Sequence, residues 1–201
     1  MPWIMDQLLP LILFALVATV TPGGATTLAT ASGAHFGYRR SLPLMVGIAF
    51  GLASMAAAAA IGLASLLIAV PSLQLAMKTI GTLYLLWLAW RIAMSGPPRL
   101  AEEMARPTRF ITGIWLLWVN PKGWAMTSAA ALSFAALANN PSALALLLGV
   151  AFGAAAILSL SLWCVAGQLL ARFLTADWQW RLTNMLLGAF LALSIIPMWL
   201  P

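Results

Sequence analysis

The chain has 201 residues, of which 63% are hydrophobic and 7% charged, and it carries a formal net charge of +6 at pH 7. The surface of a soluble protein of this length needs more charged residues than this. The composition therefore excludes an ordinary soluble domain and predicts a protein of the lipid bilayer. The positive charge does not indicate nucleic-acid binding, because the arginines flank hydrophobic segments at intervals that membrane topology explains.

Six stretches are long and apolar enough to cross a bilayer, which takes about 20 residues of helix. The predicted fold class is therefore all-α: a polytopic membrane protein with six transmembrane helices in a single transmembrane domain over residues 1–201. The six stretches are residues 8–31, 42–68, 72–94, 110–137, 142–171 and 182–199.

A proline interrupts the first of these stretches at Thr21-Pro22-Gly23-Gly24. Pro22 has no backbone donor and crowds the preceding turn, and the following glycines adopt conformations closed to other residues, so the first helix is predicted to be broken here. A half-helix that restarts after the break points N–H groups and a positive dipole end into the gap, where a substrate carboxylate would fit. The simpler alternative is a proline kink with no binding role.

Basic residues mark the connections between the predicted spans. The first connection, at 33–41, also contains His35, for which an ordinary solvated histidine is the expected state. Positive residues at span ends indicate the cytoplasmic side, and only Lys78 lies near the opposite side, so both termini are predicted to be outside. The arginines fall in the first, third and fifth connections, as Arg39, Arg40, Arg91, Arg99, Arg106, Arg109, Arg172 and Arg181.

Two glycine pairs recur in the second and fifth stretches, as Gly47 with Gly51 and as Gly149 with Gly153. Glycines four residues apart form a smooth helix face, so both spans are predicted to pack closely against neighbouring helices, an interpretation that we favour over ligand contact. The same faces would also suit a homodimer.

The fourth stretch contains a second proline, in Asn120-Pro121-Lys122. An ionisable group this far into a span costs about 2.5 to 3.5 kcal/mol on insertion scales, and such groups usually face a cavity or a partner. Lys122 is therefore predicted to contact an anion or to act as a titratable switch. The alternative is an ammonium group that reaches an interface along its flexible stem and only anchors the helix.

The two halves of the chain carry related motifs in the same order. Val20-Thr21-Pro22-Gly23-Gly24 returns as Val119-Asn120-Pro121-Lys122-Gly123, and the first glycine pair returns as the second. With three spans each, the halves are predicted to be inverted repeats with broken helices one and four, which is the layout of a secondary transporter that binds its substrate where the breaks meet. The predicted units are repeat one at 8–94, a cytoplasmic loop at 95–109 and repeat two at 110–199.

Enzymatic chemistry is not expected in this membrane domain. No Asp or Glu falls within a predicted span, which argues against hydrolytic chemistry, a carboxylate cage for a cation and an acidic proton relay. Cys164 has no partner for a disulfide or a zinc site. The prediction is a protein that is not an enzyme, with no metal and no cofactor. The acidic residues are Asp6, Glu102, Glu103 and Asp177.

Five short motifs together resemble the LysE/RhtB amino-acid exporter family over most of the chain. They are Thr21-Pro22-Gly23, the turn at 32–40, the glycine pair beginning at Gly47, the segment 81–90 and Asn120-Pro121-Lys122. The resemblance implies an inner-membrane efflux protein for amino acids or their derivatives, driven by the proton gradient. The substrate-binding residues predicted in this way are Thr21, Pro22, Gly23, Asn120, Pro121 and Lys122, with Gly24 added from the internal repeat.

The chain departs from that family at Gly24 and Ala25, where members often have Pro followed by Asn or Asp. With no carboxylate in a span, the ammonium of a substrate would face backbone carbonyls, which suits a neutral amino acid better than a dibasic one. The predicted mechanism is alternating access, with one repeat rocking against the other. Two alternatives remain: a passive channel or facilitator for small molecules, and a membrane scaffold that transports nothing.

Overall fold

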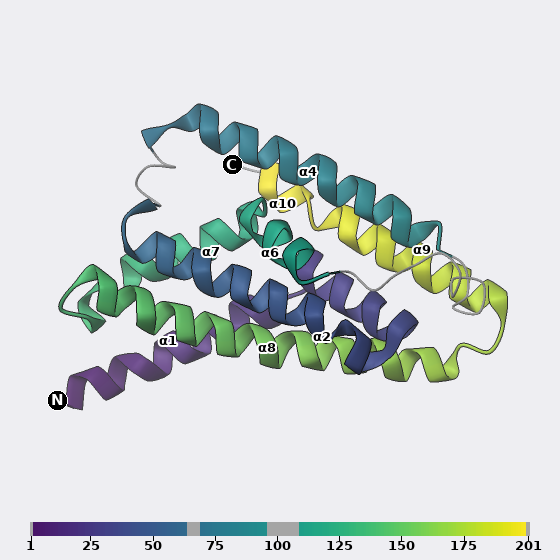
Figure 1. Ribbon diagram of the computed structural model, residues 1–201, viewed down its shortest axis with the longest axis horizontal. Helices are drawn as coiled ribbons and strands as arrows, with labels where there is room; N and C mark the ends of the chain where they lie inside the picture. Colours follow the sequence, from purple (N-terminus) through teal and green to yellow (C-terminus); the bar gives the residue numbers. More distant parts are fainter. Residues whose placement is uncertain (1, 64–68, 96–108, 200–201) are drawn as a thin grey trace.

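The computed structural model describes residues 2–63, 69–95 and 109–199. Every regular element in these ranges is a helix, which confirms the all-α prediction (Figure 1). The end of the second predicted span at 64–68 and the central loop at 96–108, with Glu102 and Glu103, lie outside the described residues. The helices are α1 (Pro2–Val20), α2 (Gly24–Ala60), α4 (Pro71–Ala93), α6 (Phe110–Trp118), α7 (Pro121–Ser133), the short 3-10 helix η1 (Ala135–Leu137), α8 (Pro141–Phe173), α9 (Asp177–Leu193) and α10 (Ile196–Trp199).

The helices follow the predicted spans, but the spans are divided differently. The first predicted span is shared between α1 and the first turns of α2, and the fourth is shared between α6 and α7. Within the described residues, α2 and α8 are the two helices with the length and hydropathy to cross a membrane, and Leu8–Val20 is a shorter apolar helix. The last predicted span starts earlier, at Asp177, and is interrupted between Leu193 and Ile196.

The long helix α2 consists of two arms that meet at Gly37. Gly37 has φ 75° and ψ 172°, a conformation that other residues rarely adopt. The hydroxyls of Ser32 and Ser41 lie 2.7 Å apart across this turn, whereas nine residues of straight helix would separate them by about 13 Å. The second arm therefore folds back beside the first. The chain reverses within the connection predicted at 33–41, but it does so at one glycine inside α2, without a separate loop.

The prediction of a solvated His35 is wrong. Its side chain is half-buried, and its Nε2 lies 3.0 Å from Oδ1 of the fully buried Asn184 of α9. The ring packs against Trp180, with 5.4 Å between the centroids. Asn184 Nδ2 also donates to the carbonyl of Ser95, 2.8 Å away, so this cluster ties the turn of α2 to α9 and to the end of α4. Only the packing of α9 on the turn removes the histidine from solvent.

Close packing of α2 against α6 depends on glycine, as predicted for the second span. A Cβ at Gly47 would collide with the carbonyl of Phe110, and one at Gly51 would lie 3.0 Å from Cα of Ile114. The second pair packs less closely: a Cβ at Gly149 would lie 3.3 Å from the carbonyl oxygen of Ala53 on α2, and one at Gly153 would lie 3.3 Å from Cβ of Ala53. Both faces are therefore filled within one copy of the chain, so they do not supply the homodimer interface that the sequence had suggested.

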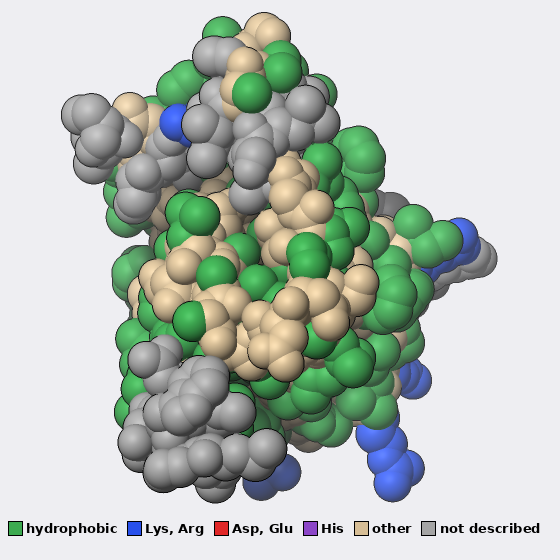
Figure 2. All heavy atoms as spheres, turned by 90° about the vertical axis from the view of Figure 1, so that its left-hand side faces the viewer, with side chains coloured by type: hydrophobic (Ala, Val, Ile, Leu, Met, Phe, Trp, Pro, Cys, Tyr) green, Lys and Arg blue, Asp and Glu red, His purple; other side chains and the backbone are tan. Residues whose placement is uncertain are grey.

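Positive charge gathers at one end of the helix bundle. Arg91 lies at the end of α4, Arg172 at the end of α8 and Arg181 in the first turns of α9, and these helix ends lie together at the right-hand side of Figure 1. Figure 2 looks onto the opposite end, where uncharged side chains and backbone fill the face and Lys and Arg show only at its margin. The guanidinium of Arg91 also packs on the ring of Trp87, 5.1 Å from its centroid.

Candidate functional site

The first helix break is caused by Pro22 and stabilised by Thr26. Pro22 has no N–H with which to continue the α1 hydrogen bonds. The N–H of Gly23 donates to Thr26 Oγ1 at 2.8 Å, and the same hydroxyl donates back to the carbonyl of Gly23 at 2.9 Å. This reciprocal pair starts α2 but leaves the last carbonyls of α1 without backbone donors. In a bilayer such carbonyls need partners from side chains, water or a ligand.

Two donors from α8 satisfy the first of these carbonyls. Ser159 Oγ donates to the carbonyl of Thr19 at 2.7 Å, and Trp163 Nε1 donates to the carbonyl of Val20 at 3.1 Å. Neither donor was predicted from the sequence. A polar Ser159 within an apolar span was the available signal, but it does not separate this role from a hydroxyl bonded within its own helix.

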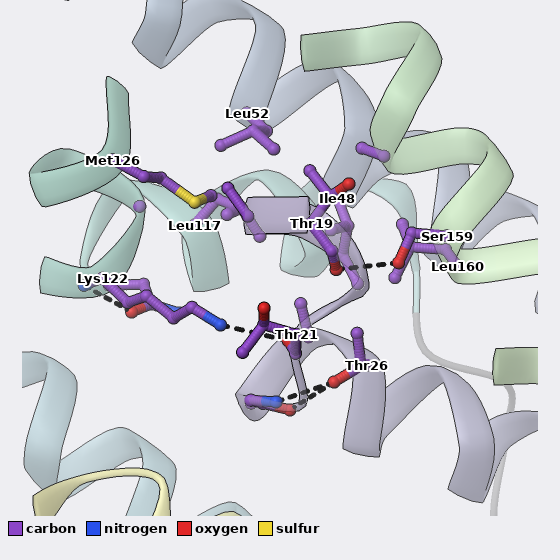
Figure 3. A pocket seen from close by; sticks show the side chains of 17 residues that line it. Thr19, Thr21, Thr26, Ile48, Leu52, Leu117, Lys122, Met126, Ser159 and Leu160 are labelled. Atoms are coloured by element: carbon purple, nitrogen blue, oxygen red, sulfur yellow. Dashed lines mark hydrogen bonds between the residues drawn. The ribbon is translucent and has the colours of Figure 1, made fainter. Parts of the chain in front are cut away.

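Two further carbonyls of the break face the ammonium group of Lys122. Its Nζ lies 3.1 Å from the carbonyl oxygen of Thr21 and 3.5 Å from that of Pro22. The side chain reaches across from the first turn of α7, and a Cβ at Gly23 would lie 3.3 Å from the same Nζ (Figure 3). A cation at the C-terminal end of a helix is favoured by the helix dipole. The half-buried ammonium therefore joins the two breaks directly.

The second break, between α6 and α7, provides its own partners. Asn120 caps α7 by accepting from the N–H of Lys122 at 3.0 Å. Trp124 Nε1 donates to the carbonyl of Trp118, the last residue of α6, at 2.9 Å. Pro121 occupies the first position of α7, where a missing N–H costs nothing. This break therefore forms a rigid turn that fixes the base of the Lys122 side chain.

A cavity lies where the two breaks meet (Figure 3). Five of the seven residues predicted from sequence line it, while Pro22 and Pro121 shape the backbone without lining it. Polar and apolar residues both line it. The predicted residues on the wall are Thr21, Gly23, Gly24, Asn120 and Lys122; further polar residues are Thr19, Thr26 and Ser159; the apolar residues include Ile48, Leu52, Leu117, Met126 and Leu160.

The cavity is too small for an amino acid as the helices stand. Its volume is about 40 Å³, and a water molecule needs about 10–15 Å³ on this measure, which leaves room for about three waters. Even glycine has more heavy atoms than that. Entry of an amino acid therefore requires the helices around the cavity to separate.

The two asparagine caps provide a test of how the turn at the start of α7 contributes to transport. Asn140 caps α8 by accepting from the N–H of Ala143 at 2.8 Å and is exposed, whereas Asn120 is buried at the cavity. Loss of either cap should cost about 1 kcal/mol of stability, measured as a fall in the thermal unfolding temperature. We expect Asn120→Ala to lower transport by more than Asn140→Ala does, because only the loss of Asn120 loosens the turn that aims Lys122. Equal transport in both variants would contradict this role of Asn120.

Comparisons with known proteins point to one family. The family model described as LysE type translocator matches residues 16–194. A cysteine/O-acetylserine efflux protein of Salmonella choleraesuis (strain SC-B67) is 34% identical over 104 residues, which cover 51% of this chain and 50% of the relative. Efflux proteins of the same name are 34% identical in Klebsiella pneumoniae and 33% identical in Escherichia coli (strain K12), each over 110 residues, 54% of this chain and 55% of the relative. The chain thus spans about half the length of the curated relatives it matches. No solved structure matches the chain.

Proposed function

Because the chain belongs to the family of LysE type translocators, we propose that it exports small neutral amino acids or their derivatives from the cell. Relatives named cysteine/O-acetylserine efflux proteins support this, since both compounds in that name are small zwitterions with uncharged side chains. The family and these relatives are transporters, in line with a protein that is not an enzyme. The observation that carries the proposal is the cavity at the meeting point of two broken helices, crossed by Lys122.

The two sides of the first break suit the two charges of a zwitterion. The carbonyls of Thr21 and Pro22 follow the C-terminal end of α1, where the helix dipole is negative, and Gly24 begins α2, where it is positive. The substrate ammonium binds at the carbonyls and the carboxylate binds at the first N–H groups of α2. The apolar lining, which includes Leu52 and Met126, takes the side chain. A second positive charge would find no acidic partner in this lining, so a dibasic amino acid is disfavoured.

Lys122 is the group that responds to substrate. Its ammonium bonds to the carbonyls that the substrate ammonium needs. The substrate therefore displaces Lys122, which turns to the substrate carboxylate. Loss or gain of a proton at this one amine is the step we propose for coupling to the proton gradient. An aspartate or glutamate relay is not needed in this scheme.

The membrane arrangement we propose has six spans in two inverted repeats of three. The arginine-rich end lies in the cytoplasm and both termini lie outside, in the inner membrane. Support comes from the arginines that share one end of the bundle, and from breaks at matching places in the two halves. Transport is by alternating access, with one repeat rocking against the other around the breaks.

Counterflow in proteoliposomes tests this function. The purified protein is reconstituted, and uptake of labelled cysteine, O-acetylserine, alanine and lysine is compared with and without an imposed proton gradient. We expect saturable flux of the three neutral compounds, accelerated by the gradient, and about tenfold less flux of lysine because its second charge is unpaired. Flux that never runs uphill would favour a passive facilitator, and preferential export of lysine would contradict the neutral substrate class.

A further inference from the structure

A second and larger cavity lies at the end of the molecule away from the arginines. Its volume is about 390 Å³, so it has the room for an amino acid that the central cavity lacks. It is formed by the end of α2 at Ala59, the end of α7 at Ala131, and the start of α8 at Asn140 and Leu144. Figure 2 looks onto this end of the bundle. The same three helices also line the central cavity.

On α2 and α8, fully buried side chains lie between the two cavities on the inward face of each helix. Leu52 of α2 lines the central cavity and Ala59 lines the outer one, and Met55 between them has no exposed surface. On α8, the stretch from the outer cavity at Leu144 to the central cavity contains Phe152, which is also fully buried. About two helical turns of packed side chains thus separate the cavities along α2.

The same order holds on α7. Met126 lines the central cavity and Ala131 lines the outer one, and Thr127 and Ala130 between them have no exposed surface. Thr127 Oγ1 donates to the carbonyl of Gly123 at 2.9 Å within its own helix, so its hydroxyl already has a partner. On each of the three helices, fully buried residues therefore lie between the two cavities. We call these residues the sealed layer: Met55 on α2, Phe152 on α8, and Thr127 and Ala130 on α7.

We propose that this sealed layer is the closed outer gate of the transport path, with Met55 and Phe152 as its moving side chains. The proposal rests on the proposed function, since the path carries the exported amino acid. Met55 lies against Gly123 of the central cavity, since a Cβ at Gly123 would lie 3.0 Å from its Cε, and methionine changes rotamer easily. Phe152 packs edge-on against Phe14, 6.3 Å between centroids, and Phe14 lies at the bundle surface where it can yield. The outer cavity is then the vestibule into which substrate is released.

Thiol labelling from outside tests the gate without any substrate. In a Cys164→Ser background, which removes the single cysteine of the chain, one cysteine is introduced at Ala135 in the outer cavity or at Leu52 in the central one. A charged, membrane-impermeant methanethiosulfonate reagent is added to each side of oriented membranes in turn. We expect the cysteine at position 135 to react at once from the side of the termini, and the one at position 52 to be protected.

Opening the gate should expose the central cavity. Met55→Ala and Phe152→Ala should each speed outside labelling at position 52 by about tenfold or more, because the sealed layer loses its filling. Met45→Ala is the matched control, since Met45 lies on the same helix with 1% exposure but away from the layer. Phe152→Leu, which keeps a large side chain, should label at a rate close to that of the parent.

The outcome separates this inference from the proposed function. If the labelling rate at position 52 does not change in Met55→Ala and Phe152→Ala, or if it rises equally in Met45→Ala, the gate is overturned, whatever the protein transports. Protection of position 135 from the outside reagent would overturn the vestibule. Counterflow measures transport independently, so a protein with no amino-acid flux could still show the labelling pattern, and the converse also holds.

Discussion

Replacing Lys122 with methionine should lower amino-acid counterflow by about two orders of magnitude, the equivalent of losing one or two hydrogen bonds to a charged group. Methionine keeps the length and apolar stem of lysine but removes the ammonium that bonds to the carbonyls of Thr21 and Pro22. The carbonyls would then hold a bound substrate ammonium with nothing to displace it. We therefore expect substrate binding to persist while gradient-driven flux is lost.

Lys78→Met is the matched control, because Lys78 is the other lysine of the chain and lies on α4, away from the cavity. It should transport at the rate of the unmodified protein. Both variants are compared as monodisperse protein in detergent before reconstitution, so that misfolding is separated from lost transport. Unchanged, gradient-dependent flux in Lys122→Met would show that the ammonium only anchors α7 and would remove the switch from the mechanism.

Adding one methyl group at Gly47 should destabilise the protein by about 3 kcal/mol or more, through overpacking. The new Cβ would collide with the carbonyl of Phe110, which belongs to the backbone of α6 and has no rotamer to change. Gly113→Ala should have a similar effect from the other side of the same contact, because its Cβ would lie 2.7 Å from the carbonyl oxygen of Leu44. Thermal unfolding followed by tryptophan fluorescence measures both.

The corresponding glycine of the second half, Gly149, provides the control. Its Cβ would lie 3.3 Å from the carbonyl oxygen of Ala53 and 3.9 Å from Cβ of Ala57, and alanine is favoured over glycine within a helix by about 1 kcal/mol. Gly149→Ala should therefore unfold within a few degrees of the parent. Equal losses in Gly47→Ala and Gly149→Ala would mean that both halves pack α2 with the same closeness, against the contacts described here.

The sequence correctly predicted where the helices break, but it did not locate the turn at Gly37 or predict the histidine contacts that lie between the first break and the next helix arm. Pro22 and Pro121 have no N–H in any conformation, so their effect on a helix can be read from the covalent structure. The sequence indicated a turn at 32–40 but did not single out Gly37, because a glycine in a polar connection is compatible with a loop of any length. His35 was misjudged because its partner Asn184 is far along the chain, on α9.

By itself, the sequence determined that the protein is helical, that it is too apolar for a soluble fold, and that helices are interrupted at Thr21 to Gly24 and at Asn120 to Lys122. These properties depend on composition and on residues next to one another, so no folding is needed to find them. Only the tertiary structure decided that Ser159, Trp163 and Lys122 complete the end of α1, that Gly47 is required where Gly149 is not, and that the cavity between the breaks is too small for an amino acid. Each of these depends on atoms that folding brings within a few ångströms from positions about one hundred residues apart in the chain, and motifs that look alike in sequence meet different neighbours there.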